Sequence, residues 1–146
     1  MMRKTRLFVM LLCAFAAAPA SAAGAVLREP AVLYDSHSER ATPLFILAAG
    51  HPLREVSRVD GWRKVSLFTG ESGWVRERFV RAARAAAVSA EMTAARSSPS
   101  FSAPEVFYAR RGVVLEVLRT EGAWLEVLHS DGETGYAPAA ELWTNY

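Results

Sequence analysis

The chain has 146 residues, of which 51% are hydrophobic and 22% are charged, as expected of a globular protein rather than a disordered one. This length gives room for one ordinary domain or two very small ones, so it excludes a large multi-domain enzyme. The formal net charge of +2 includes an N-terminal stretch that we do not expect in the folded protein.

Residues 1–23 are predicted to be a secretory signal peptide, cleaved after Ala22 or Ala23. An apolar run at 7–17 is followed by small residues at cleavage spacing, and it is preceded by three basic residues, Arg3, Lys4 and Arg6. The run is shorter than the roughly 20 residues that span a bilayer. We therefore expect a periplasmic or secreted protein with no transmembrane segment after cleavage.

Removal of the signal peptide changes the charge and the cysteine content. The formal charge falls from +2 to −1, which leaves no basic surplus for neutralising phosphates, so no nucleic acid is expected as a partner. The only cysteine, Cys13, is lost as well. The mature chain therefore has no disulfide, no thiolate metal site and no cysteine nucleophile.

An ungapped shift of 62 residues aligns residues 25–80 with residues 87–142, and 14 of the 56 positions are identical. The identical positions include residue types that rarely coincide by chance, namely Phe45/Phe107, Gly50/Gly112, Trp62/Trp124, Gly70/Gly132 and Gly73/Gly135. We infer a duplicated unit. Unit one spans residues 24–83 and unit two spans residues 84–146.

Each unit is predicted to contain a meander of three short strands separated by turn residues. The expected strands are 53–58, 62–67 and 71–75 in unit one, and 113–119, 124–129 and 133–137 in unit two. Residues 81–95 are rich in alanine, which favours a helix by propensity, but the repeat register favours a strand over 88–95. The linker is then only a few residues near 81–86, and the two units are expected to pack against each other.

Unit one resembles the bacterial SH3 (SH3b) domain family in three stretches, which are residues 50–56, Asp60-Gly61-Trp62-Arg63-Lys64-Val65 and residues 71–75. Unit two carries the same pattern in residues 112–117, 123–127 and 131–136, and Leu142-Trp143 is similar to the closing segment of that family. The whole mature chain resembles exported proteobacterial proteins with tandem SH3 units. The resemblance implies an all-β fold of two small SH3-like barrels in tandem, which bind a peptide or cell-wall polymer and catalyse nothing.

The resemblance also implies candidate ligand-binding residues, because eukaryotic relatives line a peptide groove with a Tyr, a Trp and a Pro followed by a Tyr three positions on. Unit one has Tyr34, Trp62 and Phe79 at these positions, with Arg76 in place of the Pro. Unit two has Trp124 and Pro138, while Ala95, Arg96 and Glu141 occupy the regions of the aromatics. Neither groove is complete, and unit one is the better candidate for a working site.

The alternation of side chains along a strand places Trp62 and Val65 on opposite faces. If Val65 and Leu67 face the core, Trp62 points outward beside Lys64, and Trp124 points outward beside Glu126. An outward Trp is a plausible ligand platform, but in a unit of about 60 residues a Trp can equally be part of the core.

No constellation for catalysis or metal binding is found in the sequence. His37, His51 and His129 are scattered, lack metal-ligand spacing and are interpreted as surface residues. Nucleophile-elbow, Ser-x-x-Lys and phosphate-loop motifs are absent. We therefore expect no enzyme, no metal and no cofactor.

The leading hypothesis is an exported binding module of the cell envelope, whose aromatic face in unit one recognises peptidoglycan stem peptides or an extended segment of an envelope protein. The alternative is a structural or accessory protein that modulates another envelope protein and has no ligand groove of its own. A third possibility, a hydrolase, predicts activity on murein fragments.

Overall fold

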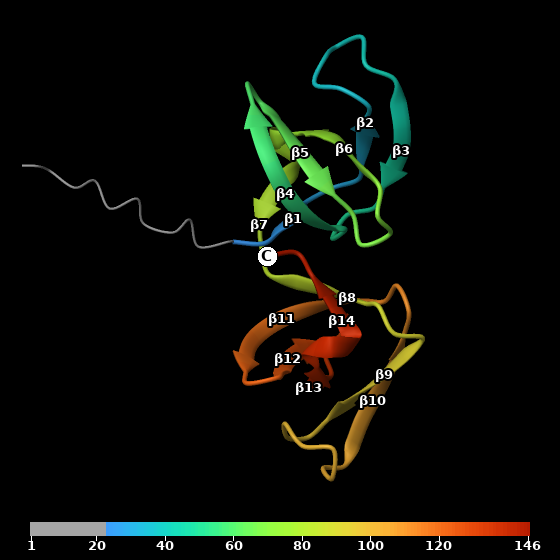
Figure 1. Cartoon of the computed structure of the whole chain (residues 1–146), viewed down its shortest axis with the longest axis vertical. Helices are drawn as coiled ribbons and strands as arrows, with labels where there is room; N and C mark the ends of the chain where they lie inside the picture. Colours follow the sequence, from blue (N-terminus) through green and yellow to red (C-terminus); the bar gives the residue numbers. More distant parts are fainter. Residues whose placement is uncertain (1–22) are drawn as a thin grey trace, which may run out of the picture.

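A computed structural model describes residues 23–146, and the predicted signal peptide lies outside these residues apart from Ala23. The described chain folds into two seven-stranded antiparallel sheets, one above the other in Figure 1, and contains no α-helix. The all-β prediction with two small SH3-like domains is thereby confirmed. No helix within the described range is long and apolar enough to cross a membrane.

The sheet of unit one has the strand order β3-β2-β6-β5-β4-β1-β7. A 3-10 helix, η1 (Glu77–Phe79), precedes the last strand. The strands are β1 (Ala25–Leu27), β2 (Ala31–Tyr34), β3 (Pro43–Leu47), β4 (Pro52–Val59), β5 (Trp62–Ser66), β6 (Ser72–Arg76) and β7 (Val80–Ala82).

The sheet of unit two has the corresponding order β10-β9-β13-β12-β11-β8-β14. Its 3-10 helix is η2 (Ala139–Glu141). The strands are β8 (Ala85–Val88), β9 (Met92–Arg96), β10 (Glu105–Arg110), β11 (Val114–Glu121), β12 (Trp124–Leu128), β13 (Thr134–Pro138) and β14 (Leu142–Thr144). From β4 to β7, every element starts and ends 62 residues before its counterpart between β11 and β14, so the inferred repeat is present in the backbone.

The predicted meanders are confirmed within two residues at each end, and the hairpin between β4 and β5 shows why they form. Asp60 and Gly61 have φ angles of 32° and 81°, so both occupy the left-handed region. A two-residue turn of this kind matches the right-handed twist of the strands it joins, and Asp-Gly is one of its preferred sequences.

The alanine-rich segment forms strands β8 and β9 rather than a helix, as the repeat register favours, but the single strand expected over 88–95 is interrupted at residues 89–91. Strand β7 ends at Ala82 and strand β8 begins at Ala85. The linker is therefore only Ala83 and Arg84, at the short end of the predicted range.

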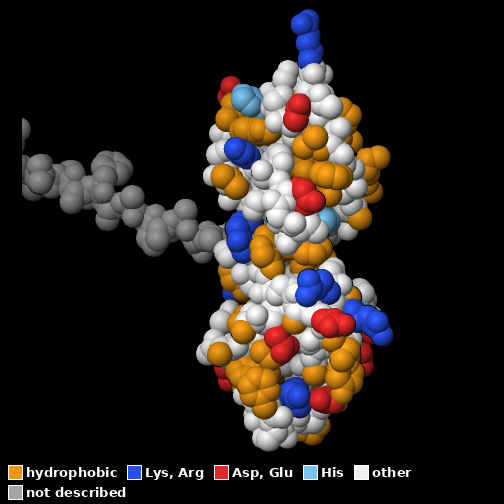
Figure 2. All heavy atoms as spheres, turned by 45° about the vertical axis from the view of Figure 1, so that its right-hand side comes forward, with side chains coloured by type: hydrophobic (Ala, Val, Ile, Leu, Met, Phe, Trp, Pro, Cys, Tyr) orange, Lys and Arg blue, Asp and Glu red, His pale blue; other side chains and the backbone are white. Residues whose placement is uncertain are grey.

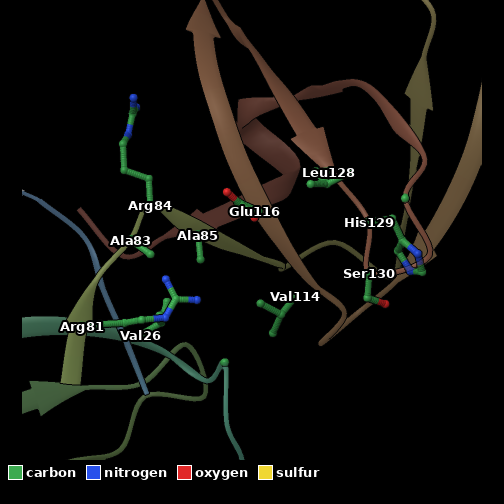
Figure 3. Close-up of a pocket in the computed structure, with 12 residues that line it drawn as sticks. Val26, Arg81, Ala83, Arg84, Ala85, Val114, Glu116, Leu128, His129 and Ser130 are labelled. Atoms are coloured by element: carbon green, nitrogen blue, oxygen red, sulfur yellow. The ribbon is translucent and has the colours of Figure 1, made fainter. Parts of the chain in front are cut away.

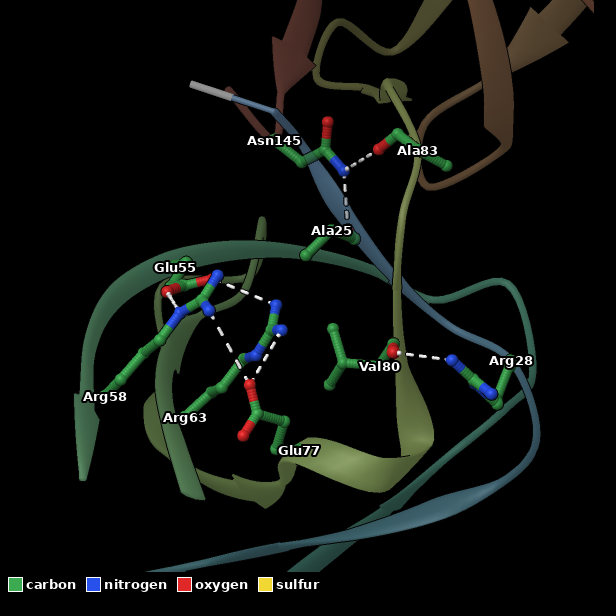
Figure 4. Close-up of polar contacts among 9 residues, drawn as sticks. All are labelled: Ala25, Arg28, Glu55, Arg58, Arg63, Glu77, Val80, Ala83 and Asn145. Carbon is green, nitrogen blue, oxygen red and sulfur yellow. Dashed lines mark hydrogen bonds and ion pairs between the residues drawn. The ribbon is translucent and has the colours of Figure 1, made fainter. Parts of the chain in front are cut away.

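Each unit has its own apolar core. Val65 and Leu67 belong to the core of unit one, as predicted, and Val127 occupies the equivalent place in unit two. The cores differ beneath β5 and β12. In unit one, Arg63 forms ion pairs of 3.1 Å with Glu55 and 3.0 Å with Glu77 (Figure 4). The positions 62 residues later hold apolar Leu125, Val117 and Ala139, which pack in or against the core of unit two.

Strands β1 and β8 are buried along their whole length, because each has the unit core on one face and the other unit on the opposite face. In β1, Ala25 and Leu27 belong to the core cluster, whereas Val26 is only 3% exposed and lies outside that cluster. In β8, Ala86 and Val88 alternate in the same way with Ala85 and Ala87. The apolar residues that lie outside the cores mark the contact between the units, which pack together as predicted.

A buried amide joins the two units where they meet. The side chain of Asn145 is 3% exposed and lies between β1 and the linker (Figure 4). Its Nδ2 donates to the carbonyl oxygens of Ala25 at 2.6 Å and Ala83 at 3.0 Å, and its Oδ1 accepts from the N–H of Ala85 at 2.9 Å. Trp143 adds a second contact, because its ring lies 4.5 Å from the guanidinium of Arg54 in unit one.

Candidate functional site

Unit two presents an open aromatic face at the start of strand β12. Trp124 is half-buried, and its ring centre lies 4.7 Å from that of Phe101. Phe101 is 71% exposed. On the other side, Trp124 pairs across the sheet with Pro138 of β13, which is buried. Trp124 and Phe101 therefore form an accessible apolar surface, with the buried Pro138 beside Trp124, and we call these three residues the unit-two aromatic face.

Phe101 lies in the loop between β9 and β10, and local hydrogen bonds hold the base of this loop. The N–H of Ser97 donates to the carbonyl of Pro104 at 2.9 Å, and Nη1 of Arg96 donates to the carbonyl of Ala103 at 3.0 Å. Arg96 also pairs with Glu105 at 3.2 Å. These contacts close the loop so that its aromatic residue lies against Trp124.

The equivalent face of unit one is covered. Trp62 lies outside the core cluster, as the alternation of side chains predicts, but it is only 6% exposed. The guanidinium of Arg76 lies 4.1 Å from the centre of its ring, and Tyr34 makes an edge contact at 5.6 Å. Arg76 is held there by an ion pair with Glu39. The prediction that Trp62 forms an exposed platform is therefore wrong, because an arginine and a tyrosine shield the indole.

The two faces differ at corresponding positions of the repeat. Glu39 of unit one corresponds to Phe101 of unit two, and Arg76 corresponds to Pro138. In unit one, the ion pair between Arg76 and Glu39 lies over Trp62, whereas in unit two the corresponding residues beside Trp124 are the apolar Pro138 and Phe101. The structure brings together a more complete apolar face in unit two than in unit one, opposite to the preference drawn from the sequence.

Phe79, the third residue expected on the unit-one face, belongs elsewhere. It packs against the core cluster of unit one, and the guanidinium of Arg78 lies 4.7 Å from its ring centre. Among the aromatic pairs of residues 23–146, Trp62 is in contact with Tyr34 and not with Phe79. Tyr34 and Trp62 therefore lie together, whereas Phe79, the last residue of η1, packs against the core of unit one.

The histidines do not form a common site. His37 is exposed, and its ring centre lies 4.6 Å from that of Trp74. Nδ1 of His129 lies 3.0 Å from Oδ1 of Asp131. His51 is not the surface residue that the sequence suggested, because its Nε2 is buried without a hydrogen-bond partner and burial lowers its pKa below 6.5. Within the described part of the chain, no group of three His, Cys, Asp or Glu residues is placed to hold a metal ion.

Comparison with known families assigns part of the chain. Residues 89–144 match the family model of the bacterial SH3 domain. This stretch, which contains the unit-two aromatic face, is similar to bacterial SH3 domains. No curated protein sequence matches the chain.

Three solved structures show partial similarity. The chain is 13% identical to NlpC2 from Trichomonas vaginalis, with a TM-score of 0.39, and the alignment covers 83% of this chain and 47% of that chain. It is 16% identical to NlpC1 from the same organism, also with a TM-score of 0.39, and that alignment covers 82% of this chain and 45% of that chain. An NlpC/P60 family protein from Bacillus cereus is 12% identical with a TM-score of 0.38, covering 83% of this chain and 56% of that chain. The chain thus spans about half the length of these structures.

Proposed function

We propose that the protein is an exported, non-enzymatic binding module of the cell envelope, which holds peptidoglycan stem peptides or an extended segment of an envelope protein on the unit-two aromatic face. The observation that carries this proposal is the contact between an exposed Phe101 and a half-buried Trp124, which pairs across the sheet with the buried Pro138. The family match over residues 89–144 supports a binding role for the same unit.

The chemistry of the face favours an extended ligand with small or apolar groups. Tilted aromatic rings leave a surface on which a peptide backbone and its aliphatic side chains can pack, and buried Trp and Tyr side chains dominate the energetics of many interfaces. Charged groups border the face, because Glu126 lies two residues from Trp124 on β12 and pairs with Arg119 at 2.7 Å. The face therefore combines an apolar centre with a charged rim, as peptide-binding surfaces do.

Unit one fits the alternative, accessory role better than a second binding role. Its tryptophan is shielded by Arg76, and exposing the indole requires the ion pair between Arg76 and Glu39 to open. We assign unit one the task of supporting unit two through the buried contact at Asn145. In this assignment only one of the two repeated faces binds ligand.

Co-sedimentation with purified peptidoglycan sacculi tests the proposal. Wild type is expected in the pellet, and Trp124→Ala and Phe101→Ala are expected to stay in the supernatant after circular dichroism confirms that both are folded. Met92→Ala is the matched control, because Met92 is a 51% exposed large apolar residue of the same unit. Trp62→Ala, once shown to be folded, should bind like wild type.

The outcomes separate the alternatives. Equal pelleting of wild type and Trp124→Ala would rule out the unit-two aromatic face as the site. If wild type does not pellet, peptidoglycan is not the ligand, and crosslinking to an envelope protein must then depend on Trp124 for the proposed face to stand.

A further inference from the structure

A cavity of about 390 Å³ lies where the two units meet, on a different part of the molecule from the unit-two aromatic face. This volume falls within the range of about 300–1,000 Å³ that is typical of small-molecule sites. The cavity borders Leu128 at the end of β12, whereas Trp124 begins the same strand. At about 3.3 Å per residue, the two features are separated by roughly 13 Å along that strand.

Unit one contributes one wall of the cavity. Val26 of β1 and Arg81 of β7 are cross-strand neighbours in this wall. The Arg81 side chain extends from β7 into the space between the units, toward Val114 (Figure 3). The linker residues Ala83 and Arg84 close the cavity at its back.

Unit two contributes the facing wall as a row across three strands. Ala85 of β8 pairs with Glu116 of β11, which pairs in turn with Leu128 of β12. Val114 lies two residues from Glu116 and therefore on the same face of β11, opposite the core residue Leu115. This row is apolar apart from the carboxylate of Glu116, and His129 and Ser130 line the cavity beyond Leu128.

Arg81 and Glu116 are the charged groups of this cavity that remain available to a ligand. Among residues 23–146, neither forms a salt bridge or a side-chain hydrogen bond. Arg84 is engaged elsewhere, because its Nη2 donates to Oγ1 of Thr120 at 3.0 Å and its guanidinium stacks 4.2 Å from the ring centre of Tyr146. His129 is paired with Asp131. Figure 2 shows basic side chains on the surface where the units meet.

We propose that this inter-unit cavity is a second binding site, which takes a short zwitterionic peptide with its carboxylate on Arg81 and its ammonium group on Glu116. A guanidinium and a carboxylate each form directional, charge-assisted hydrogen bonds with a group of opposite charge, and both Arg81 and Glu116 are exposed to a ligand. The side chains of Val26, Val114 and Leu128 receive the aliphatic part of the peptide. The site requires both units, since Arg81 comes from unit one and Glu116 from unit two.

An NMR titration of uniformly ¹⁵N-labelled protein with the tripeptide trialanine tests the proposal. We expect shifts of the backbone amides that border the cavity, at residues 83–85 and 129–132. Trialanine amide, which lacks the carboxylate, and N-acetyl-trialanine, which lacks the ammonium group, should each bind about tenfold more weakly, the loss expected for one charge-assisted contact.

Variants assign each contact to its side chain. Arg81→Gln is expected to bind trialanine about tenfold more weakly and to bind the amide no worse than wild type does. Glu116→Gln should lose the preference for trialanine over its N-acetyl form. Arg78→Gln is the matched control, because it removes another exposed arginine of unit one that lies over Phe79 and not in the cavity.

Three results would overturn the inference. The first is the absence of shifts around the cavity at millimolar trialanine, and the second is equal binding by wild type and Arg81→Gln. The third is loss of trialanine binding in folded Trp124→Ala, which would place the peptide on the unit-two aromatic face. Failure of trialanine to bind leaves sedimentation with sacculi unaffected, so this inference and the proposed function can fail separately.

Discussion

Replacement of Asn145 by alanine is expected to be among the most destabilising single substitutions outside the two cores. The change removes two buried hydrogen bonds and one partly buried one, and leaves the carbonyls of Ala25 and Ala83 and the N–H of Ala85 without this partner. A hydrogen bond contributes about 1 kcal/mol, and an unsatisfied buried group costs about 1–3 kcal/mol. Because water can reach part of this junction once the side chain is shortened, we expect a loss of about 2–4 kcal/mol in total.

Thermal and urea unfolding, followed by circular dichroism and by tryptophan fluorescence, measure this loss. For a protein of this size, about 4 °C of Tm corresponds to 1 kcal/mol, so the midpoint should fall by about 8–16 °C. The loss of coupling between the units should also separate one transition into two. Thr120→Ala is the control, since it removes an exposed hydrogen bond to Arg84 near the same junction and should change stability by less than about 0.5 kcal/mol. An Asn145→Ala variant that unfolds with the wild-type midpoint would refute the assignment of Asn145 as the junction between the units.

Three further predictions concern unit one. Arg76→Ala should uncover Trp62 and raise the quenching of tryptophan fluorescence by acrylamide, whereas unchanged quenching would show that Arg76 does not shield the indole. Gly73→Ala should lower the free energy of unfolding, measured in urea, by about 1–3 kcal/mol, because the added Cβ would lie 2.6 Å from the carbonyl oxygen of Tyr34. A variant as stable as wild type would contradict this close approach. Burial lowers the pKa of His51 in the folded state, so the unfolded chain binds the proton more tightly and stability should fall as pH drops through about 6.5. His51→Gln should remove that part of the pH dependence measured by urea unfolding, and parallel profiles for the two proteins would exclude His51 as its source.

The sequence was sufficient for the fold because the same pattern occurs twice. An amphipathic strand of five residues is ambiguous on its own, but turn glycines and a Trp that recur 62 positions later define both the strands and their register. The repeat also indicated correctly that the alanine-rich segment is not a helix, although it did not show the break at residues 89–91. Alanine favours a helix in isolation, but β8 is buried on both faces, and small side chains allow the two units to approach closely there.

The candidate site was harder to predict because exposure depends on what covers a residue. The alternation of side chains correctly placed Trp62 on the face away from the core, but it could not show that Arg76 lies over the ring. Phe101 was missed because it is a single aromatic in a serine-rich loop, where no strand pattern points to it. Its one signal was its place in the repeat, where a phenylalanine stands opposite the glutamate of unit one.

The hydrogen bond between Asn145 and Ala25 joins residues 120 positions apart, so it can form only after residue 145 has been synthesised. The sheet of unit one is complete once Ala82 has been synthesised, so unit one can fold before unit two has emerged. Until Asn145 is added, the outer faces of β1 and the linker have no partner, and Val26 is open to water. We therefore expect docking of the two units to follow closure of their sheets, and a refolding experiment should show a slower phase in which the units join.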